Sequence, residues 1–413
     1  MELYQISLDM YQTAGVGVLA LILGLFLTRK IYFLRKMCIP SPVSGGIIFS
    51  LIFLALYKWF GIELSFNGTL KDLFMIIFFT SVGYQSNLRV IRQGGKPIII
   101  MVLLVAVIII FQNLIPVGIA AAMGHDPLLG MAAGSIPMSG GHGTAGGFSG
   151  LLEQMGLSGA SSITMAAATF GLVAGSLIGG PLAEILIRRN NLSIEDVSED
   201  DADTMVGMEV NAGLPEAREV HMQSEESEFR KLSRAAYAMV LAIALGTFVS
   251  KLLAMTGITF PTYFGSLLAA ALMRNLCEAF PGKVRLQMDR IVSLGDVCLS
   301  LFLGMAMVSL RLWELAGMAL PLFSMLVAQL VFMGVFAYFV AFPLLGRNYD
   351  AAVLVSGICG FGLGATPNAM ANMSAVCYKY RYAVKPFIVV PIIGAMFADL
   401  INTTVITIFL NIL

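Results

Sequence analysis

Between two long apolar segments lies the stretch Ser135-Ile-Pro-Met-Ser-Gly-Gly-His-Gly-Thr-Ala-Gly-Gly-Phe148, rich in glycine and hydroxyl side chains. A second version, Gly360-Phe-Gly-Leu-Gly-Ala-Thr-Pro-Asn368, occupies the corresponding place in the second half of the chain. Non-helical backbone at membrane depth is tolerated only where it is buried in protein or lines a wet cavity. Two such interruptions, one in each half, indicate a transporter whose binding site lies between two repeats.

The composition is that of a membrane protein. Hydrophobic residues make up 58% of the 413 residues and charged residues 12%, whereas soluble domains are about one quarter charged. The formal net charge of zero gives no bulk basic face, so we expect no nucleic-acid partner. The five cysteines are scattered and form no Cys-x-x-Cys pair, so neither a disulfide framework nor a zinc site is indicated.

Segments of roughly 17 to 25 apolar residues are long enough to cross a bilayer as helices. In the first half we predict spans at 13–34, 43–60, 72–90, 97–122 and 159–188, and in the second half at 233–255, 261–277, 291–310, 318–344 and 383–411. A basic cluster follows the first segment instead of preceding it, so we expect this segment to be retained and not cleaved as a signal peptide.

The distribution of Lys and Arg between the spans predicts the orientation. With both termini outside, the cytoplasmic side collects Arg29, Lys30, Arg35, Lys36, Arg89, Arg92, Lys96, Arg188, Arg189, Arg274, Lys283, Arg285, Arg290, Arg347, Lys379, Arg381 and Lys385. The outer side keeps Lys58, Lys71, Lys251 and Arg311. This asymmetry requires that the two glycine-rich stretches enter and leave the membrane on one side, each as a re-entrant hairpin.

The two halves repeat around an acidic linker. Residues 190–232 are polar and rich in Asp and Glu, which predicts a flexible cytoplasmic linker. Asp72-Leu-Phe-Met corresponds to Asp296-Val-Cys-Leu, and Asp126-Pro-Leu-Leu to Asp350-Ala-Ala-Val, both at an offset of 224 residues (296 − 72 and 350 − 126). Because each half has an odd number of spans, the copies must be inverted.

The predicted fold class is an all-α polytopic membrane protein of two inverted repeats. Each repeat has five transmembrane helices and one re-entrant helical hairpin. The first repeat covers residues 1–189 with its hairpin at about 126–156, and the second covers 233–413 with its hairpin at about 350–378. Such repeats can exchange conformations, which opens the site to either side of the membrane in turn.

The motifs resemble those of the glutamate:sodium symporter family. They are Ile39-Pro-Ser-Pro-Val-Ser-Gly-Gly46, Ser139-Gly-Gly-His-Gly-Thr144, Ala168-Thr-Phe-Gly-Leu-Val173, Asn348-Tyr-Asp-Ala-Ala-Val-Leu354 and Cys359-Gly-Phe-Gly-Leu-Gly-Ala-Thr-Pro367. The resemblance covers nearly the whole chain. It implies sodium-driven uptake of L-glutamate, ten spans plus two hairpins, a homodimer in the bacterial inner membrane, and an elevator-type movement.

The two hairpin tips are the candidate substrate site. A hairpin of two short helices presents a helix N-terminus, whose free N–H groups favour an anion. The candidate residues are Ser139, Gly140, Gly141, His142, Gly143, Thr144, Gly362, Gly364, Ala365, Thr366 and Asn368. The alternative is that the glycines only permit tight turns. His142 either bonds the substrate or joins the hairpin to the scaffold, and as a lone histidine it is a weak metal signal.

A cation site is predicted on the last span. Asp399 is an ionisable group inside an apolar segment, where such groups are costly and functional by default. Asn402 and Thr403 share its helix face at i+3 and i+4, giving an oxygen set suited to sodium as the coupling ion. Gln112, Asn113 and Gln329 are polar groups inside spans that either complete cation or substrate contacts or form interhelical hydrogen bonds.

Three glycines, Gly171, Gly175 and Gly179, repeat at intervals of four on one span and should let another backbone approach. We expect them to pack against a hairpin.

Two other motifs match patterns of enzymes by chance. Gly141-His-Gly-Thr-Ala-Gly146 fits a dinucleotide-binding pattern, but no strand precedes it. Ser149 lies in a Gly-x-Ser-Gly context like that of a serine protease, but no later span carries a histidine.

The sequence therefore favours a secondary symporter for sodium and L-glutamate, with no enzymatic activity and no cofactor besides the coupling ion. The nearest alternative is a sodium- or proton-coupled carrier of another carboxylate, with the proton carried by Asp399. A remote alternative is an intramembrane hydrolase that uses Ser149. No Walker motif is present, which disfavours ATP-driven pumping.

Overall fold

The computed structural model describes residues 4–87, 95–192, 225–257, 259–279, 286–315 and 317–413. The first half contains β1 (Tyr4–Leu8), α1 (Met10–Lys30), α2 (Tyr32–Lys36), α3 (Ser41–Ala55) with a π-helical extension (Leu56–Phe60), β2 (Ile62–Phe66), α4 (Thr69–Gln85), α6 (Gly95–Ala122), α7 (Pro127–Ala132), α8 (Gly141–Gln154) and α9 (Ala160–Arg189). The order of helices follows the predicted spans of this half.

The second half begins with α11 (Glu225–Ala254), which starts inside the stretch predicted as a linker. It is followed by α12 (Phe264–Ala279), α13 (Met288–Val308), a short 3-10 turn (Leu312–Leu315), α14 (Ala319–Phe336), a π-helical turn (Ala337–Ala341), α15 (Phe342–Leu344), α16 (Tyr349–Gly362), α17 (Thr366–Lys379), α18 (Val384–Ile393), a second π-helical turn (Gly394–Ala398) and α19 (Asp399–Ile412). The rest of the predicted linker, residues 193–224, lies outside the described residues.

Seven helices in the described part of the chain are long and apolar enough to cross a membrane. They are Met10–Lys30, Ser41–Phe60, Ile98–Ala122, Ala160–Arg189, Glu228–Ala254, Met288–Val308 and Ala319–Leu344. The predicted spans at 72–90 and 261–277 form the shorter helices α4 and α12, with 17 and 16 residues. The predicted span at 383–411 is formed by α18, the π-helical turn and α19 in succession.

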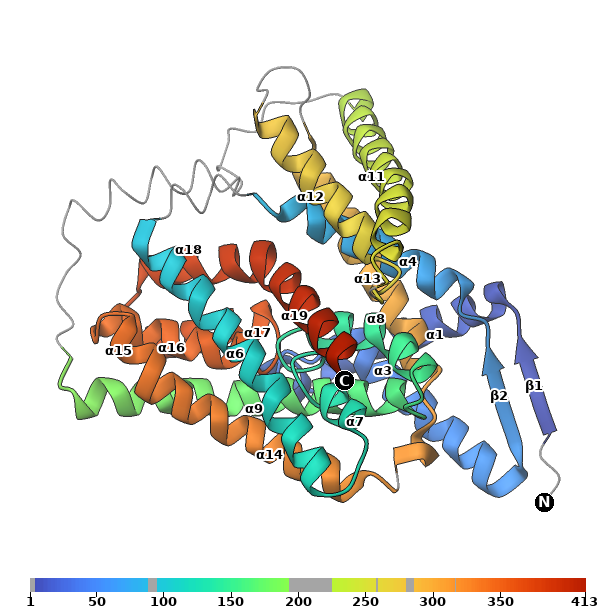
Figure 1. The fold of residues 1–413 in the computed structure, drawn as a ribbon, viewed down its shortest axis with the longest axis horizontal. Coiled ribbons are helices and arrows are strands. Elements are labelled where there is room, and N and C mark those ends of the chain that lie inside the picture. Colours follow the sequence, from blue (N-terminus) through green and yellow to red (C-terminus); the bar gives the residue numbers. More distant parts are fainter. Residues whose placement is uncertain (1–3, 88–94, 193–224, 258, 280–285, 316) are drawn as a thin grey trace.

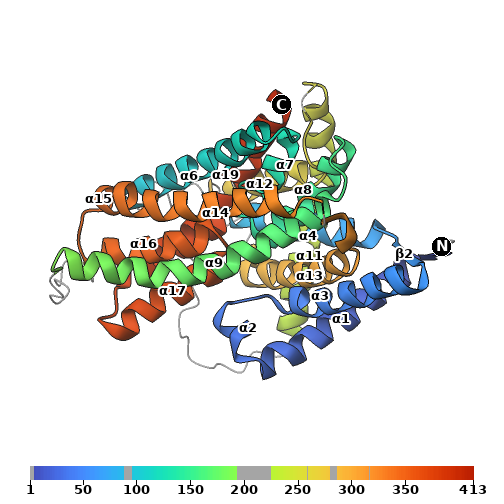
Figure 2. The same cartoon turned by 90° about the horizontal axis from the view of Figure 1, so that it is seen from below.

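The helices pack in two groups (Figures 1 and 2). In the α4 group, α4 packs on α12 and α13, α1 packs on α3 and α13, and α11 packs on α12. In the α9 group, α9 packs on α8, α16 and α17, while α6 packs on α7 and α14, and α18 on α16 and α17. The two groups meet where α8 contacts α13 and where the turn Gly394–Ala398 contacts α4.

A two-stranded sheet is the exception to the helical pattern, and the sequence analysis did not predict it. β1 and β2 pair in parallel, with Tyr4 opposite Ile62 and Leu8 opposite Phe66. Both segments alternate apolar and polar side chains, which is the period of a strand. Gly61 lets the chain leave the preceding helix, because its φ of 65° lies in the left-handed region that ends many helices.

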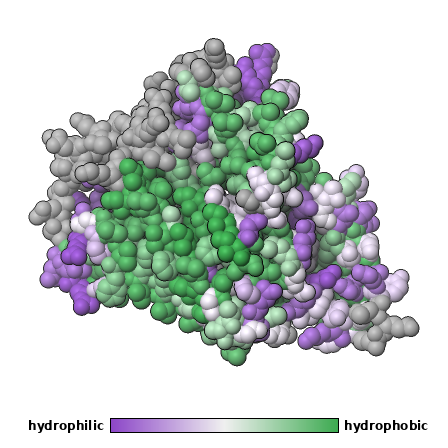
Figure 3. All heavy atoms as spheres, in the orientation of Figure 1, coloured by the Kyte–Doolittle hydropathy of each residue, from purple (hydrophilic) through white to green (hydrophobic). Residues whose placement is uncertain are grey.

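Apolar side chains cover much of the surface formed by α6, α14 and their neighbours (Figure 3). On α6, Leu103 and Phe111 are 61% and 45% exposed, and on α14, Leu320 and Phe323 are 73% and 60% exposed. A continuous apolar surface over several helices is unfavourable in water. It fits a chain whose outer surface is solvated by lipid.

Candidate functional site

The two glycine-rich stretches, predicted to act together, lie in contact. The chain is non-helical between α7 and α8, and again between α16 and α17. The carbonyl oxygen of Gly364 would lie 3.0 Å from a Cβ atom placed on Gly141. The Oγ of Ser139 lies 3.4 Å from the carbonyl oxygen of Gly362. Residues more than 220 positions apart in the chain therefore form one local structure.

A cavity of about 280 Å³ lies where these stretches meet, and we call it the central cavity. Most of the predicted substrate residues line it, together with the predicted cation residue Asp399. These are Ser139, Gly140, Gly141, His142, Gly143, Thr144, Gly364, Ala365, Thr366, Asn368 and Asp399. Gly362 lies behind the lining, where its carbonyl oxygen accepts a hydrogen bond from Gln112 Nε2.

Two helices begin at the central cavity. α8 starts at Gly141 and α17 at Thr366, and both residues line the cavity. The first turn of a helix leaves its N–H groups without intrahelical acceptors, and the helix dipole makes that end favourable for an anion. Gly141 has a φ of 58°, a left-handed conformation that glycine adopts without strain. The cavity thus has two anion-binding ends and no lysine or arginine among its described lining residues.

Asn368 adds a free acceptor to this site. Its Nδ2 donates a hydrogen bond to the carbonyl oxygen of Leu172 at 2.8 Å, which fixes the side chain. Its Oδ1 is buried and has no hydrogen-bond partner among the described residues. A buried unpaired acceptor costs roughly 1–3 kcal/mol, so a ligand ammonium or cation that reaches Oδ1 would recover that cost.

The predicted cation residues share one face of the α19 segment. Asp399 lines the central cavity. One turn further, Asn402 Nδ2 donates to the carbonyl oxygen of Ser135 at 3.1 Å, while Asn402 Oδ1 and the buried Thr403 Oγ1 have no partner in the described structure. Carboxylate, amide and hydroxyl oxygens are the ligands that hard cations prefer. These three side chains carry the kinds of oxygen that a hard cation prefers.

The structure adds Tyr263 to this neighbourhood, which the sequence analysis did not assign. Its ring stacks on Phe79 with 3.7 Å between the centroids, and its hydroxyl faces Thr403 and Asp399. The hydroxyl is buried beside that of Thr403. Its place near the start of the span predicted at 261–277 gave no signal of this proximity.

The amide side chains inside the spans hold the first glycine-rich stretch in place. Ser139 Oγ donates to Gln112 Oε1 at 2.6 Å, and Gln329 Nε2 donates to the carbonyl oxygen of Gln112 at 2.6 Å. Asn113 Oδ1 accepts from the backbone N–H of Ser135 at 3.0 Å. Gln112, Asn113 and Gln329 are not among the described lining of the central cavity, and their hydrogen bonds go to the glycine-rich stretches and to α6.

His142 lies at the central cavity and is bonded to a helix of its own group, not to the α4 group. It lines the central cavity, and its Nε2 lies 3.0 Å from Thr169 Oγ1 on α9. Thr169 Oγ1 also donates to the carbonyl oxygen of Met165 at 2.9 Å. The histidine is therefore oriented by α9, with one ring edge at the cavity.

The glycines of α9 pack against the second glycine-rich helix pair, as predicted. A Cβ atom on Gly171 would lie 2.2 Å from the carbonyl oxygen of Leu363, and one on Gly175 would lie 3.0 Å from that of Cys359. A Cβ atom on Gly179 would lie 2.2 Å from the side chain of Asn372. Only hydrogen at these positions lets α9 approach α16 and α17 this closely.

α8 carries a glycine face of its own toward α4 and α13. A Cβ atom on Gly143 would lie 3.1 Å from the ring of Phe78, and one on Gly146 would lie 2.4 Å from the ring of Phe302. Gly147 continues the same face. At these three positions the backbone of α8 therefore lies directly against aromatic rings.

The rest of the cavity wall is apolar, and the sequence analysis did not identify it. Cys38 and Pro40 come from the segment between α2 and α3, and Phe78 and Leu299 come from α4 and α13. These residues have no chemistry that distinguishes them from core side chains. Only the motif at 39–46 pointed to this part of the chain.

A family model and two known proteins are similar to this chain. A family model described as sodium/glutamate symporter matches residues 6–382. The chain is 38% identical over 410 residues to the sodium/glutamate symporter of Escherichia coli (strain K12), covering 98% of both chains. It is 37% identical over 394 residues to that of Haemophilus influenzae (strain Rd), covering 95% of both chains.

Proposed function

The chain belongs to the sodium/glutamate symporter family, and from that premise we propose that it carries L-glutamate into the cell together with sodium. The central cavity is the proposed substrate site. The observation that carries this proposal is the meeting of two helix N-termini, the free Asn368 Oδ1 and the Asp399 carboxylate around one cavity of about 280 Å³.

The cavity chemistry matches an amino dicarboxylate. The two carboxylates of glutamate would each face one helix N-terminus, at Gly141 and Thr366, where N–H groups and the dipole favour negative charge. Its ammonium would be accepted by Asn368 Oδ1. The glycines at the tips let these groups reach the backbone without meeting a side chain.

Sodium would bind at Asp399, Asn402 and Thr403, on the α19 side of the cavity. An ionised carboxylate is costly in the membrane interior, and a sodium ion beside it would offset that cost. Substrate and cation would thus neutralise one another before the loaded site moves. Each charge that moves inward through 100 mV contributes roughly 2.3 kcal/mol.

The proposed movement is of the elevator type, with the α9 group moving against the α4 group. One of the places where the two groups meet is α8, where Gly143 and Gly146 lie against Phe78 and Phe302. Corresponding elements support two inverted repeats with re-entrant hairpins: α8 begins at Gly141 and α17 at Thr366, an offset of 225 residues (366 − 141). These helices are 14 residues long, too short to span a bilayer.

We further propose a homodimer in the bacterial inner membrane with both termini outside. The excess of Lys and Arg on the predicted cytoplasmic side supports this orientation. The outer face of α1, where Leu19, Ile22 and Phe26 are more than half exposed, is the proposed dimer contact.

The test is uptake of labelled L-glutamate into proteoliposomes under an imposed inward sodium gradient, with potassium-only and pH-gradient controls. Thr403→Val and Thr404→Val are a matched pair on α19. The hydroxyl of Thr403 is buried without a partner, whereas that of the exposed Thr404 bonds its own helix at 2.8 Å. We expect Thr403→Val to raise the half-saturating sodium concentration at least fivefold and Thr404→Val to leave it unchanged.

Asp399→Asn should abolish sodium-driven accumulation in the same assay. Uptake with no cation, or an equal effect of the two threonine variants, would contradict the sodium assignment. Uptake driven by a pH gradient alone would make Asp399 a proton carrier. Absence of glutamate uptake under every gradient would contradict glutamate as the substrate and favour another carboxylate.

A further inference from the structure

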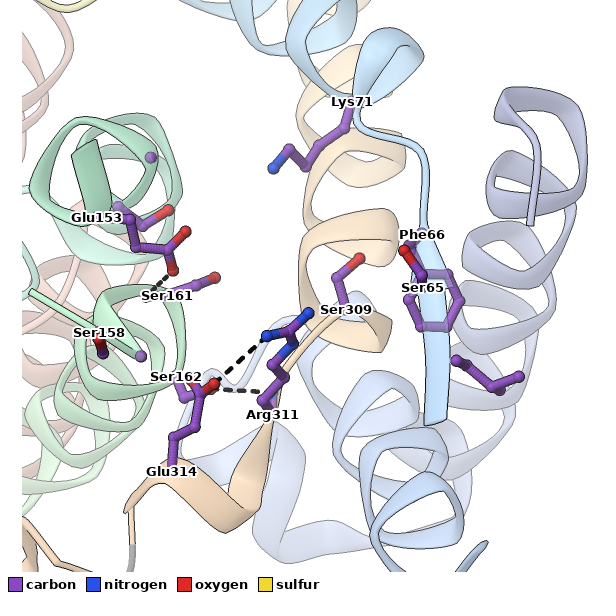
Figure 4. A pocket seen from close by; sticks show the side chains of 14 residues that line it. Ser65, Phe66, Lys71, Glu153, Ser158, Ser161, Ser162, Ser309, Arg311 and Glu314 are labelled. Carbon is purple, nitrogen blue, oxygen red and sulfur yellow. Dashed lines mark hydrogen bonds and ion pairs between the residues drawn. The ribbon is translucent and has the colours of Figure 1, made fainter. Parts of the chain in front are cut away.

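A second and larger cavity, of about 410 Å³, lies at the far end of α8, and we call it the Arg311 pocket (Figure 4). α8 reaches from the central cavity at Gly141 to this pocket at Glu153. Along α8 the two linings come closest at Thr144 and Ser149, about 7.5 Å apart at 1.5 Å per residue. The two cavities have no lining residue in common, so we treat the Arg311 pocket as a site of its own.

The wall of the Arg311 pocket comes from both helix groups. Ser65 on β2, Lys71 on α4, and Ser309 and Arg311 after α13 form one side. Glu153 at the end of α8 lies on the other side, with serines at the start of α9. A volume of 300–1,000 Å³ is typical of small-molecule sites, so the pocket can hold a free amino acid.

The pocket is lined by equal numbers of positive and negative side chains, and the N–H donors of the positive ones are not all engaged. Two cations, Lys71 and Arg311, face the same space as two carboxylates, Glu153 and Glu314 (Figure 4). Arg311 lies 3.5 Å from both Glu63 and Glu314, and Lys71 lies 4.0 Å from Asp72. Ordinary charge-assisted hydrogen bonds are about 2.7–2.9 Å long. Both cations can therefore still bind a ligand carboxylate at close range.

The carboxylate of Glu153 is held in position by one hydrogen bond and can accept more. Its Oε1 accepts a hydrogen bond from the backbone N–H of Ser161 at 3.2 Å, which ties the end of α8 to the start of α9. The pocket cations come from the α4 group and Glu153 faces them from α8, while Glu314 lies beside Arg311. Opposed charges separated by a small-molecule-sized space match a zwitterion better than a simple anion.

We propose that the Arg311 pocket is a second binding site, for the zwitterion of an α-amino acid. The ligand carboxylate lies between Arg311 and Lys71, where the planar guanidinium can bind it through two hydrogen bonds. The ligand ammonium lies against Glu153. The choice of glutamate as the amino acid rests on the proposed function, and in the proposed orientation the pocket faces the outside and collects substrate there.

Two properties separate this site from the central cavity. Its own cations, Lys71 and Arg311, supply the positive charge for the ligand carboxylate, so binding does not need sodium. Its charges are partly exposed, with 49% of the Arg311 side chain accessible, so binding weakens as ionic strength rises. At the central cavity, by contrast, sodium strengthens binding.

The experiment is equilibrium dialysis of labelled L-glutamate with the full-length protein in choline buffer, free of sodium. Wild type and Asp399→Asn should both bind, and binding should fall at least fivefold when choline chloride rises from about 10 mM, where the Debye length is about 30 Å, to about 1 M, where it is about 3 Å. The double variant Lys71→Gln/Arg311→Gln should weaken sodium-free binding at least fivefold. Lys58→Gln, which removes an exposed charge outside the pocket, is the control and should bind like wild type.

Glutarate, which is glutamate without its ammonium group, tests the proposed contact between the ligand ammonium and Glu153. It should bind at least threefold more weakly than glutamate to wild type, and Glu153→Gln should remove that difference. Retained uptake at saturating glutamate shows that a variant is folded. Absence of sodium-free binding in wild type, or equal binding by the double variant and Lys58→Gln, would overturn the proposal. Uptake without sodium-free binding refutes this site alone, whereas sodium-free binding without uptake refutes the proposed function alone.

Discussion

Replacing Gly171 with alanine tests the close contact between α9 and the turn that leads into α17. The new Cβ atom would lie 2.2 Å from the carbonyl oxygen of Leu363, whereas the shortest ordinary C···O contacts are about 3.3 Å. One backbone must therefore retreat by about 1 Å. Both partners are main chain, so no side-chain rotation can relieve the clash. The cost should fall at the upper end of the range of about 1–3 kcal/mol for an overpacked core.

The assay combines thermal unfolding of the purified protein with glutamate uptake. Gly118→Ala is the matched control, because a Cβ atom there meets nothing within 4 Å and alanine favours helix by up to about 1 kcal/mol over glycine. We expect Gly171→Ala to lower the midpoint of unfolding and to reduce uptake at least tenfold, because Leu363 adjoins the cavity residue Gly364. Gly118→Ala should keep the unfolding midpoint and the uptake at the wild-type level or above. Equal behaviour of the two variants would refute the described packing of α9.

Three further predictions concern single side chains. Ser139→Ala leaves the buried Oε1 of Gln112 without its 2.6 Å hydrogen bond, which should cost roughly 1–3 kcal/mol; Ser139→Thr, which keeps the hydroxyl, should be milder in the same unfolding assay. Ser149→Ala should leave uptake unchanged, because its hydroxyl bonds only its own helix at 3.0 Å, and loss of all activity would favour the hydrolase alternative. Cys38 lines the central cavity, so glutamate with sodium should slow the labelling of Cys38 by maleimide but not that of Cys277. A Cys38 labelling rate that is the same with and without glutamate and sodium would contradict this placement.

The long helices were predictable because their apolar length is set by the bilayer. The span predicted at 97–122 is α6, Gly95–Ala122, and that predicted at 159–188 is α9, Ala160–Arg189. The strands were not predictable in the same way. β1 and β2 have five residues each, and their pairing depends on a fold that brings Tyr4 beside Ile62.

The candidate site was predictable where backbone chemistry defines it. Glycine and hydroxyl residues inside apolar segments required a departure from helix, and this located Ser139 and Thr366 at the cavity. The roles of polar side chains within helices were less accessible. Whether Gln112 faces the cavity or a neighbouring helix depends on the rotation of α6 about its axis, which an apolar segment with little periodicity does not fix.

Apolar wall residues could not be identified at all from the sequence. Phe78 is one of many phenylalanines in the spans, and its place at the cavity follows from how α4 crosses α8. Tyr263 likewise reaches Asp399 only through the packing of α12 on α4.

The glycine face of α8 has a consequence for how the two helix groups hold one another. Helices usually lock together because ridges of side chains on one fit into grooves on the other, which fixes a register. At Gly143 and Gly146, no side chain separates the backbone of α8 from the rings of Phe78 and Phe302, and at Gly147 none separates it from Tyr263. The rings fill the hollows that the glycines leave, so α8 can move along α4 and α13 only after these rings turn away, and their rotation should set the barrier between two positions of the helix groups.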